Sequence, residues 1–263
     1  MTLHRLTKEQ ITSYREKGYV LNIPAVFSTE EIAELREELR ELEKLLQPNE
    51  KMIHIRDWHM ESRWIYDIAA HPQILAYVED ILGPDFFMWG TQFFGKEPYS
   101  SDTVAWHQDA YYWPLRPHNT VTVWLAFTDV DEENGAMQVI PGTHRAGLIR
   151  HKKSNDDSVL TLELEEGTFD VSQAKSLCLK AGEISLHDDN AVHGSPANRS
   201  DRWRIGLTIR YSGTNVRRTP HDEDWIHIMK GSDLPGLNRQ RAVPREKFAR
   251  LAPDFFQHDP SVR

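Results

Sequence analysis

The stretch Val121-Thr122-Val123-Trp124-Leu125-Ala126-Phe127 is a short run of β-branched, aromatic and other apolar residues, a composition typical of a buried β-strand. Glycine, proline, asparagine and aspartate separate this run from others like it. Further strands are predicted on the same grounds at residues 86–89, 91–94, 137–140, 176–179, 184–186 and 204–211. Many short strands in one part of a chain favour an antiparallel sandwich or barrel.

The residues before this β-rich part are predicted to form helices that pack on one face of it. Thr7 and Ser28 are each followed three residues later by a glutamine or a glutamate, which is the spacing of a capping box at the start of a helix. The first helix is expected to end at Gly18, before a short strand at residues 19–24. A third helix is predicted at residues 71–82. The fold class is therefore mainly β with flanking helices.

We expect the 263 residues to form a single domain, because the sequence contains no internal repeat and no flexible linker. In this interpretation residues 1–85 provide the helical support and residues 86–215 form the β core. Residues 216–263 are polar, rich in arginine and aspartate, and are predicted to be a C-terminal tail.

Composition excludes several functional classes. Forty acidic against 31 basic side chains give a formal charge of −9, which argues against a general nucleic-acid or anionic-membrane partner. No apolar run reaches the ~18 residues needed to cross a bilayer, and the N-terminus lacks the apolar segment of a signal peptide, so we expect a cytoplasmic protein.

The single Cys178 excludes an intramolecular disulfide and a cysteine-based zinc site, and its apolar neighbours predict that it is buried. The oligomeric state is not indicated.

The most informative histidine is His107, in Trp106-His107-Gln108-Asp109. In an extended segment residues i and i+2 point to the same face, so His107 and Asp109 could bind one metal ion together. The spacing alone is weak, because His187-x-Asp189 and His221-x-Glu223 share it.

A third ligand must come from elsewhere in the chain, and His193 follows a predicted strand and precedes a turn. Two imidazoles and one carboxylate form the facial triad of non-haem Fe(II) oxygenases, which leaves positions open for substrate and oxygen. Zinc is the competing metal. His187 is the alternative third ligand, and His144 is a further candidate for which a role in a turn is favoured.

Arg204 lies eleven residues after His193, at the start of a predicted strand. Its planar guanidinium is suited to bidentate binding of a carboxylate, as a dicarboxylate co-substrate of iron would require. A structural salt bridge would explain a lone arginine equally well, so its meaning depends on the combination with the metal ligands.

With these residues assembled, the chain resembles the phytanoyl-CoA dioxygenase family of Fe(II)/2-oxoglutarate oxygenases over roughly residues 6–211. The motifs that carry the resemblance are Leu6-Thr7-Lys8-Glu9-Gln10, Gly18-Tyr19-Val20, Phe27-Ser28-Thr29-Glu30-Glu31, Trp106-His107-Gln108-Asp109-Ala110-Tyr111-Tyr112-Trp113-Pro114, Trp124-Leu125-Ala126-Phe127-Thr128-Asp129, Asn134-Gly135-Ala136-Met137-Gln138-Val139-Ile140-Pro141-Gly142-Thr143-His144 and Val192-His193-Gly194-Ser195, followed by Arg204.

The resemblance implies a double-stranded β-helix, a jelly-roll or cupin-like core. It implies that Fe(II) is held by His107, Asp109 and His193, and that O2 and 2-oxoglutarate are co-substrates. Arg204 would pair with the distal carboxylate of 2-oxoglutarate; the further cofactor-binding residues that it implies are Ser195, Trp124 and Gln92. Because related halogenases have a small residue in place of the carboxylate ligand, Asp109 favours hydroxylation, with succinate and CO2 as co-products.

For the substrate we expect a small polar metabolite, such as an aminoalkylphosphonate or an amino-acid-like compound. Aromatic residues beside the predicted metal ligands could form a pocket wall or a cage for an ammonium group, or could simply pack in the core: Tyr111, Tyr112 and Trp113. Several cations could meet an anionic substrate, namely Lys96, Arg56, Arg210, Arg217 and Arg218.

The alternative functions are a metal-dependent hydrolase or isomerase on the same fold, which would not need Arg204, and a non-catalytic binding module, which would typically have lost one of the metal-ligating residues.

Overall fold

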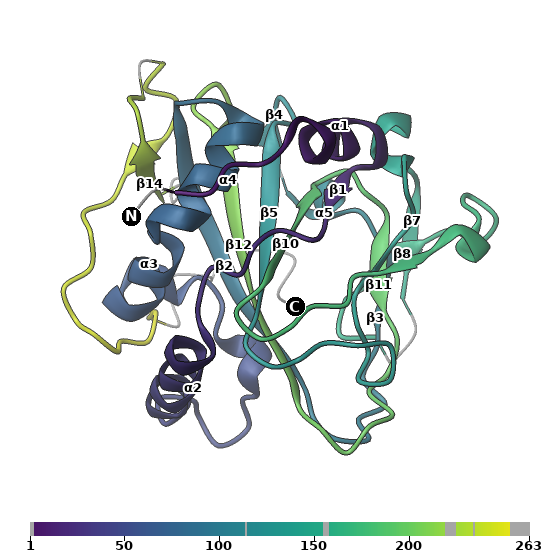
Figure 1. Ribbon diagram of the computed structural model, residues 1–263, viewed down its shortest axis with the longest axis horizontal. Helices are drawn as coiled ribbons and strands as arrows, with labels where there is room; N and C mark the ends of the chain where they lie inside the picture. Colours follow the sequence, from purple (N-terminus) through teal and green to yellow (C-terminus); the bar gives the residue numbers. More distant parts are fainter. Residues whose placement is uncertain (1–2, 114, 155–157, 219–224, 234, 253–263) are drawn as a thin grey trace.

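The computed structural model describes residues 3–113, 115–154, 158–218, 225–233 and 235–252 and has a jelly-roll core with helices packed on one side (Figure 1). The α-helices are α1 (Lys8–Lys17), α2 (Thr29–Glu43), α3 (Arg63–Ala69), α4 (Pro72–Leu82) and the short α5 (Asp109–Tyr112). Short 3-10 helices cover Met52–His54, Trp58–Met60, Thr143–Ala146 and Val171–Gln173.

The described strands form two principal sheets. The larger sheet has the order β1 (Tyr19–Val20), β10 (Ile184–Asp188), β5 (Thr120–Ala126), β12 (Arg204–Gly213), β2 (Phe86–Lys96), β14 (Trp225–Lys230) and β15 (Arg239–Gln240). The smaller sheet has the order β3 (Val104–His107), β11 (His193–Ser195), β6 (Gln138–Val139) and β9 (Lys175–Ser176). Separate pairs are β13 (Arg217–Arg218) with β4 (Leu115–Arg116), and β7 (His151–Lys153) with β8 (Leu162–Leu164).

Alternation along β5 explains how the large sheet is covered on both faces. Val121, Val123 and Leu125 belong to a core that includes buried residues of α2, α3 and α4. Trp124 and Ala126 point to the opposite face and belong to a second core with apolar residues of the smaller sheet. Successive side chains of a strand point to opposite faces, so one continuous apolar run serves both layers. Figure 1 shows α3 and α4 on one side of the large sheet, with β3 and β11 on the other.

The helix predictions are confirmed. The hydroxyl of Thr7 accepts a hydrogen bond from the backbone N–H of Gln10 at 3.2 Å, and the Gln10 side chain accepts one from the backbone N–H of Thr7 at 2.8 Å. Ser28 and Glu31 form the same reciprocal pair at the start of α2. Gly18 ends α1 with φ +82°, a left-handed conformation that glycine adopts without strain.

Several strand boundaries differ from the prediction. Residues 86–89 and 91–94 belong to one strand, β2, because Gly90 continues the pairing with β12. The predicted strand at 19–24 ends after Val20, and the one at 176–179 ends at Ser176. The expectation that Cys178 is buried is wrong: its neighbours Leu177 and Leu179 point inward, so Cys178 is exposed.

The predicted C-terminal tail contains a strand of the main sheet. β14 pairs antiparallel with β2, with His227 opposite Met88 and Ile228 opposite Phe87. The sequence of β14, Trp225-Ile226-His227-Ile228-Met229-Lys230, has apolar residues on both faces of the strand: Ile226 and Ile228 belong to one apolar cluster, and Trp225 and Met229 pack against another. The His221-x-Glu223 pair, which has the metal-ligand spacing, lies outside the described residues.

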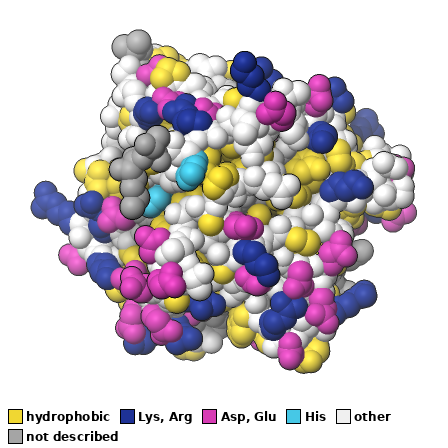
Figure 2. Space-filling view, in the orientation of Figure 1, with side chains coloured by type: hydrophobic (Ala, Val, Ile, Leu, Met, Phe, Trp, Pro, Cys, Tyr) yellow, Lys and Arg dark blue, Asp and Glu magenta, His cyan; other side chains and the backbone are white. Residues whose placement is uncertain are grey.

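The outer surface carries charges of both signs. Acidic and basic side chains are intermingled on the face shown in Figure 2. None of the helices in the described part of the chain combines the length and the apolar character that a membrane span requires.

Two histidines are buried where β14 meets the rest of the protein. His227 is 2 % exposed and His59 is fully buried, with their ring centroids 5.8 Å apart. Nδ1 of His59 is 2.9 Å from the hydroxyl of Thr91. Burial lowers the pKa of His227 to about 4, and burial followed by the charge of His227 lowers the pKa of His59 well below its usual value.

These buried histidines make folding stability depend on pH. The pKa of His227 is lower in the folded chain than in the unfolded chain, so its contribution is fully present above pH ~6.5 and is lost as the pH falls toward 4. Between pH 7 and pH 5 we expect the free energy of unfolding to fall by about 2 kcal/mol from His227 alone.

Urea titrations at the two pH values would measure this loss. The His227→Phe variant should lose less stability on acidification than the wild type, whereas the same substitution at the exposed His54 should not change the loss. An equal loss in wild type and His227→Phe would contradict the prediction.

Candidate metal centre

The smaller sheet brings the two predicted histidine ligands together. His107 ends β3 and His193 begins β11, and the two residues are directly paired in the antiparallel register. Nδ1 of His107 is 2.8 Å from the carbonyl oxygen of Ala105, and Nδ1 of His193 is 2.9 Å from that of Ala191. A carbonyl can only accept, so both Nδ1 atoms donate, which leaves each Nε2 available as a metal ligand.

Asp109 completes the group, in the way that the i, i+2 spacing predicts. β3 ends at His107 and Asp109 is the first residue of α5, but Gln108 between them keeps an extended backbone (φ −115°, ψ +127°), so the side chains of His107 and Asp109 point to the same face. The turn directs the carboxylate to the histidines: one oxygen of Asp109 is 3.5 Å from Nε2 of His107 and 3.9 Å from Nε2 of His193. The three candidate ligand atoms all lie within 4.8 Å of one another.

Gln108, between the two ligands, holds this turn in place, and the sequence analysis did not identify it. Its side chain is fully buried. The amide nitrogen donates to the carbonyl oxygens of Gly147 and Asn190, at 2.9 and 2.7 Å, and the amide oxygen accepts from the N–H of Ile149 at 2.7 Å. Three hydrogen bonds from one side chain therefore fix the conformation that aims Asp109.

His187, the alternative third ligand, lies behind the group. It is 1 % exposed on β10, and its Nε2 is 3.7 Å from the second oxygen of Asp109. The mutually close ligand atoms are those of His107, Asp109 and His193. His144 lies elsewhere, with Nε2 3.0 Å from the carbonyl oxygen of Arg15. It is therefore held in a turn, as the sequence favoured.

The surroundings favour the protonation states that a metal requires. Burial opposes ionisation of the Asp109 carboxyl, but the three histidines around it outweigh that effect and hold its pKa well below the usual range. Burial, together with the charge of His107, places the pKa of His193 well below its usual value. A carboxylate beside a neutral imidazole is the state in which both groups can coordinate a cation.

A second cluster surrounds Arg204, which is 2 % exposed at the start of β12. Its Nε and Nη2 donate to the carbonyl oxygen of Gly135, at 3.2 and 2.8 Å, and its guanidinium lies 5.2 Å from the ring centroid of Trp124. Lys96 is its register partner on β2 and donates to the hydroxyl of Ser195 at 2.8 Å. Burial, together with the charge of Arg204, lowers the pKa of Lys96 to about 6.

Lys96 therefore lies at the Arg204 end of the site, although the sequence suggested it only as a substrate contact. Within the described residues, neither Lys96 nor Arg204 forms an ion pair with a carboxylate. Burial and the charge of Arg204 disfavour the protonated form of Lys96, and an acid bound beside both groups would favour it, so the pair is suited to binding an acid.

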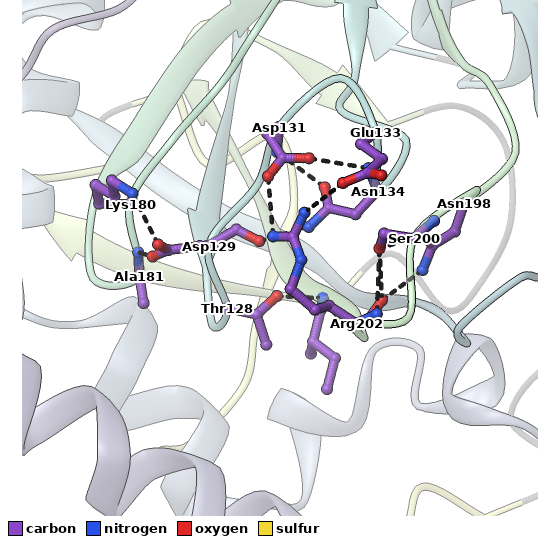
Figure 3. A network of polar contacts seen from close by, with 11 residues as sticks. Thr128, Asp129, Asp131, Glu133, Asn134, Lys180, Ala181, Asn198, Ser200 and Arg202 are labelled. Carbon is purple, nitrogen blue, oxygen red and sulfur yellow. Dashed lines mark hydrogen bonds and ion pairs between the residues drawn. The ribbon is translucent and has the colours of Figure 1, made fainter.

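Polar contacts connect the loop at residues 129–134 to the segment at residues 198–202, which leads into Arg204 (Figure 3). Arg202 forms ion pairs with Asp131 at 2.9 Å and with Glu133 at 3.1 Å, and its carbonyl oxygen accepts from the side chain of Asn198 at 2.6 Å. These contacts join the loop that carries Gly135 to the segment that leads into Arg204. The carbonyl that orients the guanidinium is thereby fixed relative to it.

A glycine also makes room for Trp124. A Cβ atom at Gly206 would lie 2.1 Å from the Trp124 ring, so only glycine permits this tryptophan to lie flat across β12. The flat ring forms one wall of the site and supports the Arg204 guanidinium.

One cavity of about 160 Å³ is lined by the three candidate metal ligands together with Trp124, Ser195 and Arg204, whereas Lys96 does not line it. The lining also includes three of the predicted substrate residues, Tyr112, Trp113 and Arg210. Tyr112 and Trp113 contribute aromatic walls, and Arg210 and Gln92 contribute polar groups. Tyr111 is not among the lining residues: it is 42 % exposed and stacks on His151 at 3.9 Å between ring centroids.

Both ends of the Gln92 side chain already have protein partners. Its nitrogen donates to the carbonyl oxygen of Ile53 at 3.1 Å, and its oxygen accepts from Arg210 at 3.2 Å. Gln92 thus links β2 to a neighbouring segment and to Arg210. The predicted hydrogen bond from Gln92 to a co-substrate stays a prediction.

Comparison with protein families gives one clear match. The family model described as phytanoyl-CoA dioxygenase matches residues 14–206. Among curated proteins, the peroxisomal phytanoyl-CoA dioxygenase of Bos taurus is 27 % identical over 174 residues, which cover 64 % of this chain and 52 % of that protein. The chain thus spans about half the length of this relative.

A bacterial relative is matched over more of its length. The probable alpha-ketoglutarate-dependent hypophosphite dioxygenase of Stutzerimonas stutzeri is 23 % identical over 228 residues, 79 % of each chain. Among solved structures, the apo form of the non-heme monooxygenase ThoJ has a TM-score of 0.80 and 28 % identity, covering 95 % of this chain and 94 % of that chain. CytC3 with Fe(II) and alpha-ketoglutarate has a TM-score of 0.68 at 23 % identity, covering 94 % and 100 %, and shares the fold.

The positions of His193 and His187 predict how substitution of each residue should change the affinity for a metal ion. His193→Gln removes a candidate ligand and should lower the affinity for Mn(II) more than about 100-fold, whereas His187→Gln removes only a neighbour of Asp109 and should lower it about 10- to 100-fold. Calorimetric titration of the metal-free protein would measure both. His144→Gln is the control and should bind Mn(II) as the wild type does. If His187→Gln abolished binding and His193→Gln did not, His187 would be the third ligand.

Proposed function

Because the chain belongs to the phytanoyl-CoA dioxygenase family, as the match over residues 14–206 establishes, we propose that it is a non-haem Fe(II)- and 2-oxoglutarate-dependent dioxygenase that hydroxylates a C–H bond of a small polar metabolite. The observation that carries the proposal is the convergence of His107, Asp109 and His193 on a cavity that also contains the Arg204 cluster.

The residues present fit an Fe(II) ion. Two imidazoles and one carboxylate are the donor set of non-haem Fe(II) oxygenases, and the carboxylate and the imidazole of His193 favour their coordinating protonation states. His107, Asp109 and His193 would hold the ion. Iron, when bound together with 2-oxoglutarate and O2, supplies the oxidising power for hydroxylation, with succinate and CO2 as co-products.

The Arg204 cluster would bind the distal carboxylate of 2-oxoglutarate. Arg204 supplies a guanidinium that Gly135 and Trp124 hold in a fixed orientation. Ser195, which lines the cavity and accepts from Lys96, supplies a hydroxyl. A carboxylate bound there would pair with the guanidinium of Arg204 and would favour the protonated form of Lys96, which burial and the charge of Arg204 otherwise disfavour.

The remaining walls would orient the substrate and exclude water. Trp113 is 7 % exposed, and the Tyr112 hydroxyl donates to the carbonyl oxygen of Leu162 at 2.8 Å, so both aromatic side chains are held in place. The names of two relatives, a hypophosphite dioxygenase and an ectoine dioxygenase, support a small molecule as the substrate. An aminoalkylphosphonate or an amino-acid-like compound stays our candidate. The cytoplasmic location and the absence of nucleic-acid and membrane partners stay predictions.

An anaerobic titration tests the proposal. Adding Fe(II) and then 2-oxoglutarate to metal-free protein should produce a metal-to-ligand charge-transfer band that requires both additions. Asp109→Ala should abolish the band because it removes a ligand, and Arg204→Ala should weaken it because it removes the anchor of the distal carboxylate. A protein that gave no band, bound zinc tightly and kept a hydrolytic activity in Arg204→Ala would instead be a metal-dependent hydrolase.

Lys96 should contribute to 2-oxoglutarate affinity. Lys96→Met keeps the length of the side chain but removes its charge, and we expect the Kd for 2-oxoglutarate to rise about 10-fold, the loss of one charge-assisted hydrogen bond of about 1.5 kcal/mol. The same band, followed against 2-oxoglutarate concentration, would measure it. Lys44→Met, at the exposed residue that follows the last residue of α2, is the matched control. An unchanged Kd in Lys96→Met would remove Lys96 from the proposed binding site.

A further inference from the structure

Arg210 is a second buried guanidinium on the strand that carries Arg204. Arg204 and Arg210 are six residues apart on β12, so their side chains point to the same face, with their Cα atoms separated by roughly 20 Å. Both line the cavity that contains the candidate metal ligands. The cavity therefore has one cationic cluster at the proposed 2-oxoglutarate end and another cation well away from it.

Arg210 forms no ion pair among the described residues, although the charges of Asp109 and Asp57 act on it from a distance. Its side chain is 6 % exposed, Nη2 donates to the Gln92 oxygen at 3.2 Å, and Nε is buried without a hydrogen-bond partner. Its guanidinium lies 4.9 Å from the ring centroid of Trp113 and 5.8 Å from that of Trp89. Aromatic faces compensate a buried charge only in part, since a cation–π contact is worth about 0.5–2 kcal/mol.

The backbone around Arg210 is shaped to hold the side chain. The pairing of β12 with β2 shifts register between Arg210 and Tyr211, and bulges of this kind redirect side chains. Opposite Arg210 stands Gly90, where a Cβ atom would lie only 3.1 Å from Cδ of Arg210. Trp89 is itself fixed, because its ring nitrogen donates to the hydroxyl of Ser212 at 3.0 Å. The guanidinium is thus pre-oriented.

Basic and acidic groups both lie near Arg210, and the charges of Asp109 and Asp57 act on it. Arg56 lines the same cavity, with its Nε 3.5 Å from a carboxylate oxygen of Asp57. The other oxygen of Asp57 accepts from the backbone N–H of Thr91 at 2.8 Å. Asp57 is thus engaged with Arg56 and the backbone, and Asp109 is a candidate metal ligand, so neither carboxylate forms a direct ion pair with Arg210.

We propose that Arg210 binds an anionic group of the substrate, so that the substrate is a small organic acid, a carboxylate or a phosphonate. The proposal rests on the proposed dioxygenase function, in which Arg204 and Lys96 are occupied by 2-oxoglutarate. The acid of the substrate would supply the direct ion pair that Arg210 lacks among the described residues. The walls formed by Tyr112 and Trp113 would contact its carbon chain.

The test measures binding rather than turnover. The protein is loaded with Mn(II) and saturating 2-oxoglutarate, so that the Arg204 end is filled, and is titrated with butyrate, with propylphosphonate and with the neutral butyramide. Calorimetry gives the affinities, and tryptophan fluorescence reports on binding beside Trp113 and Trp89. We expect at least one acid to bind at least 10-fold more tightly than the amide, and the preferred acid identifies the anionic group.

The variants separate recognition from folding. Arg210→Gln should reduce the affinity for that acid at least 10-fold with unchanged 2-oxoglutarate affinity, and Arg210→Lys, which keeps the charge, should retain part of the affinity. Arg217→Gln is the matched control, since Arg217 is exposed on β13 and does not line the cavity. Thermal unfolding would check that each variant is folded.

Two outcomes would overturn the inference: equal affinity for acids and amide, or an acid affinity that does not change in Arg210→Gln. Arg210 would then be a structural cation held between tryptophan rings. Failure of the wild type to bind 2-oxoglutarate would instead contradict the proposed function. The acid titration would in that case be repeated without 2-oxoglutarate, and its dependence on Arg210 would still decide the question.

Discussion

The antiparallel pairing of β3 with β11 is the constraint on which the candidate site depends. It sets His107 directly opposite His193, although 86 residues separate them in the chain. Each imidazole is then fixed by a hydrogen bond to a carbonyl two residues earlier. The third group, Asp109, reaches the same point because Gln108 anchors the turn after β3. A change in the register of these two short strands would separate all three groups.

β12 positions the residues that line the rest of the cavity. Its alternate residues Leu207, Ile209 and Tyr211 pack against the helical layer, and the Tyr211 hydroxyl donates to the carbonyl oxygen of Ala69 at 2.7 Å. The residues between them face the cavity, so helix packing on one side orients the charged groups on the other. The stability of the core and the geometry of the site therefore depend on the same strand.

Much of this could be predicted from the sequence, and the exceptions have physical reasons. Capping boxes and apolar stripes are local signals, so α1 and α2 are found by inspection. The grouping of His107, Asp109 and His193 could be predicted from motif order and from the i, i+2 spacing, but the anchoring of Gln108 could not, because its partners Gly147 and Asn190 lie far away in the chain. Lys96 carries no local signal at all: its proximity to Arg204 is a cross-strand register, which only the assembled sheet defines.

The attachment of β14 to β2 has a consequence for how the protein can be divided. The family match ends at residue 206, yet β12 continues to Gly213 and β14 covers the far side of β2. A fragment cut at the matched boundary would lose both Arg210 and the strand that hydrogen-bonds to residues 86–88. Residues 86–88 of β2 would then have no paired strand on either side, because residues 211–213 of β12 are removed as well, and Phe86, Phe87 and Met88, all fully buried in the whole protein, would be exposed. Exposed apolar edges recruit strands from other molecules, so such a fragment would aggregate even though it contained every candidate metal ligand.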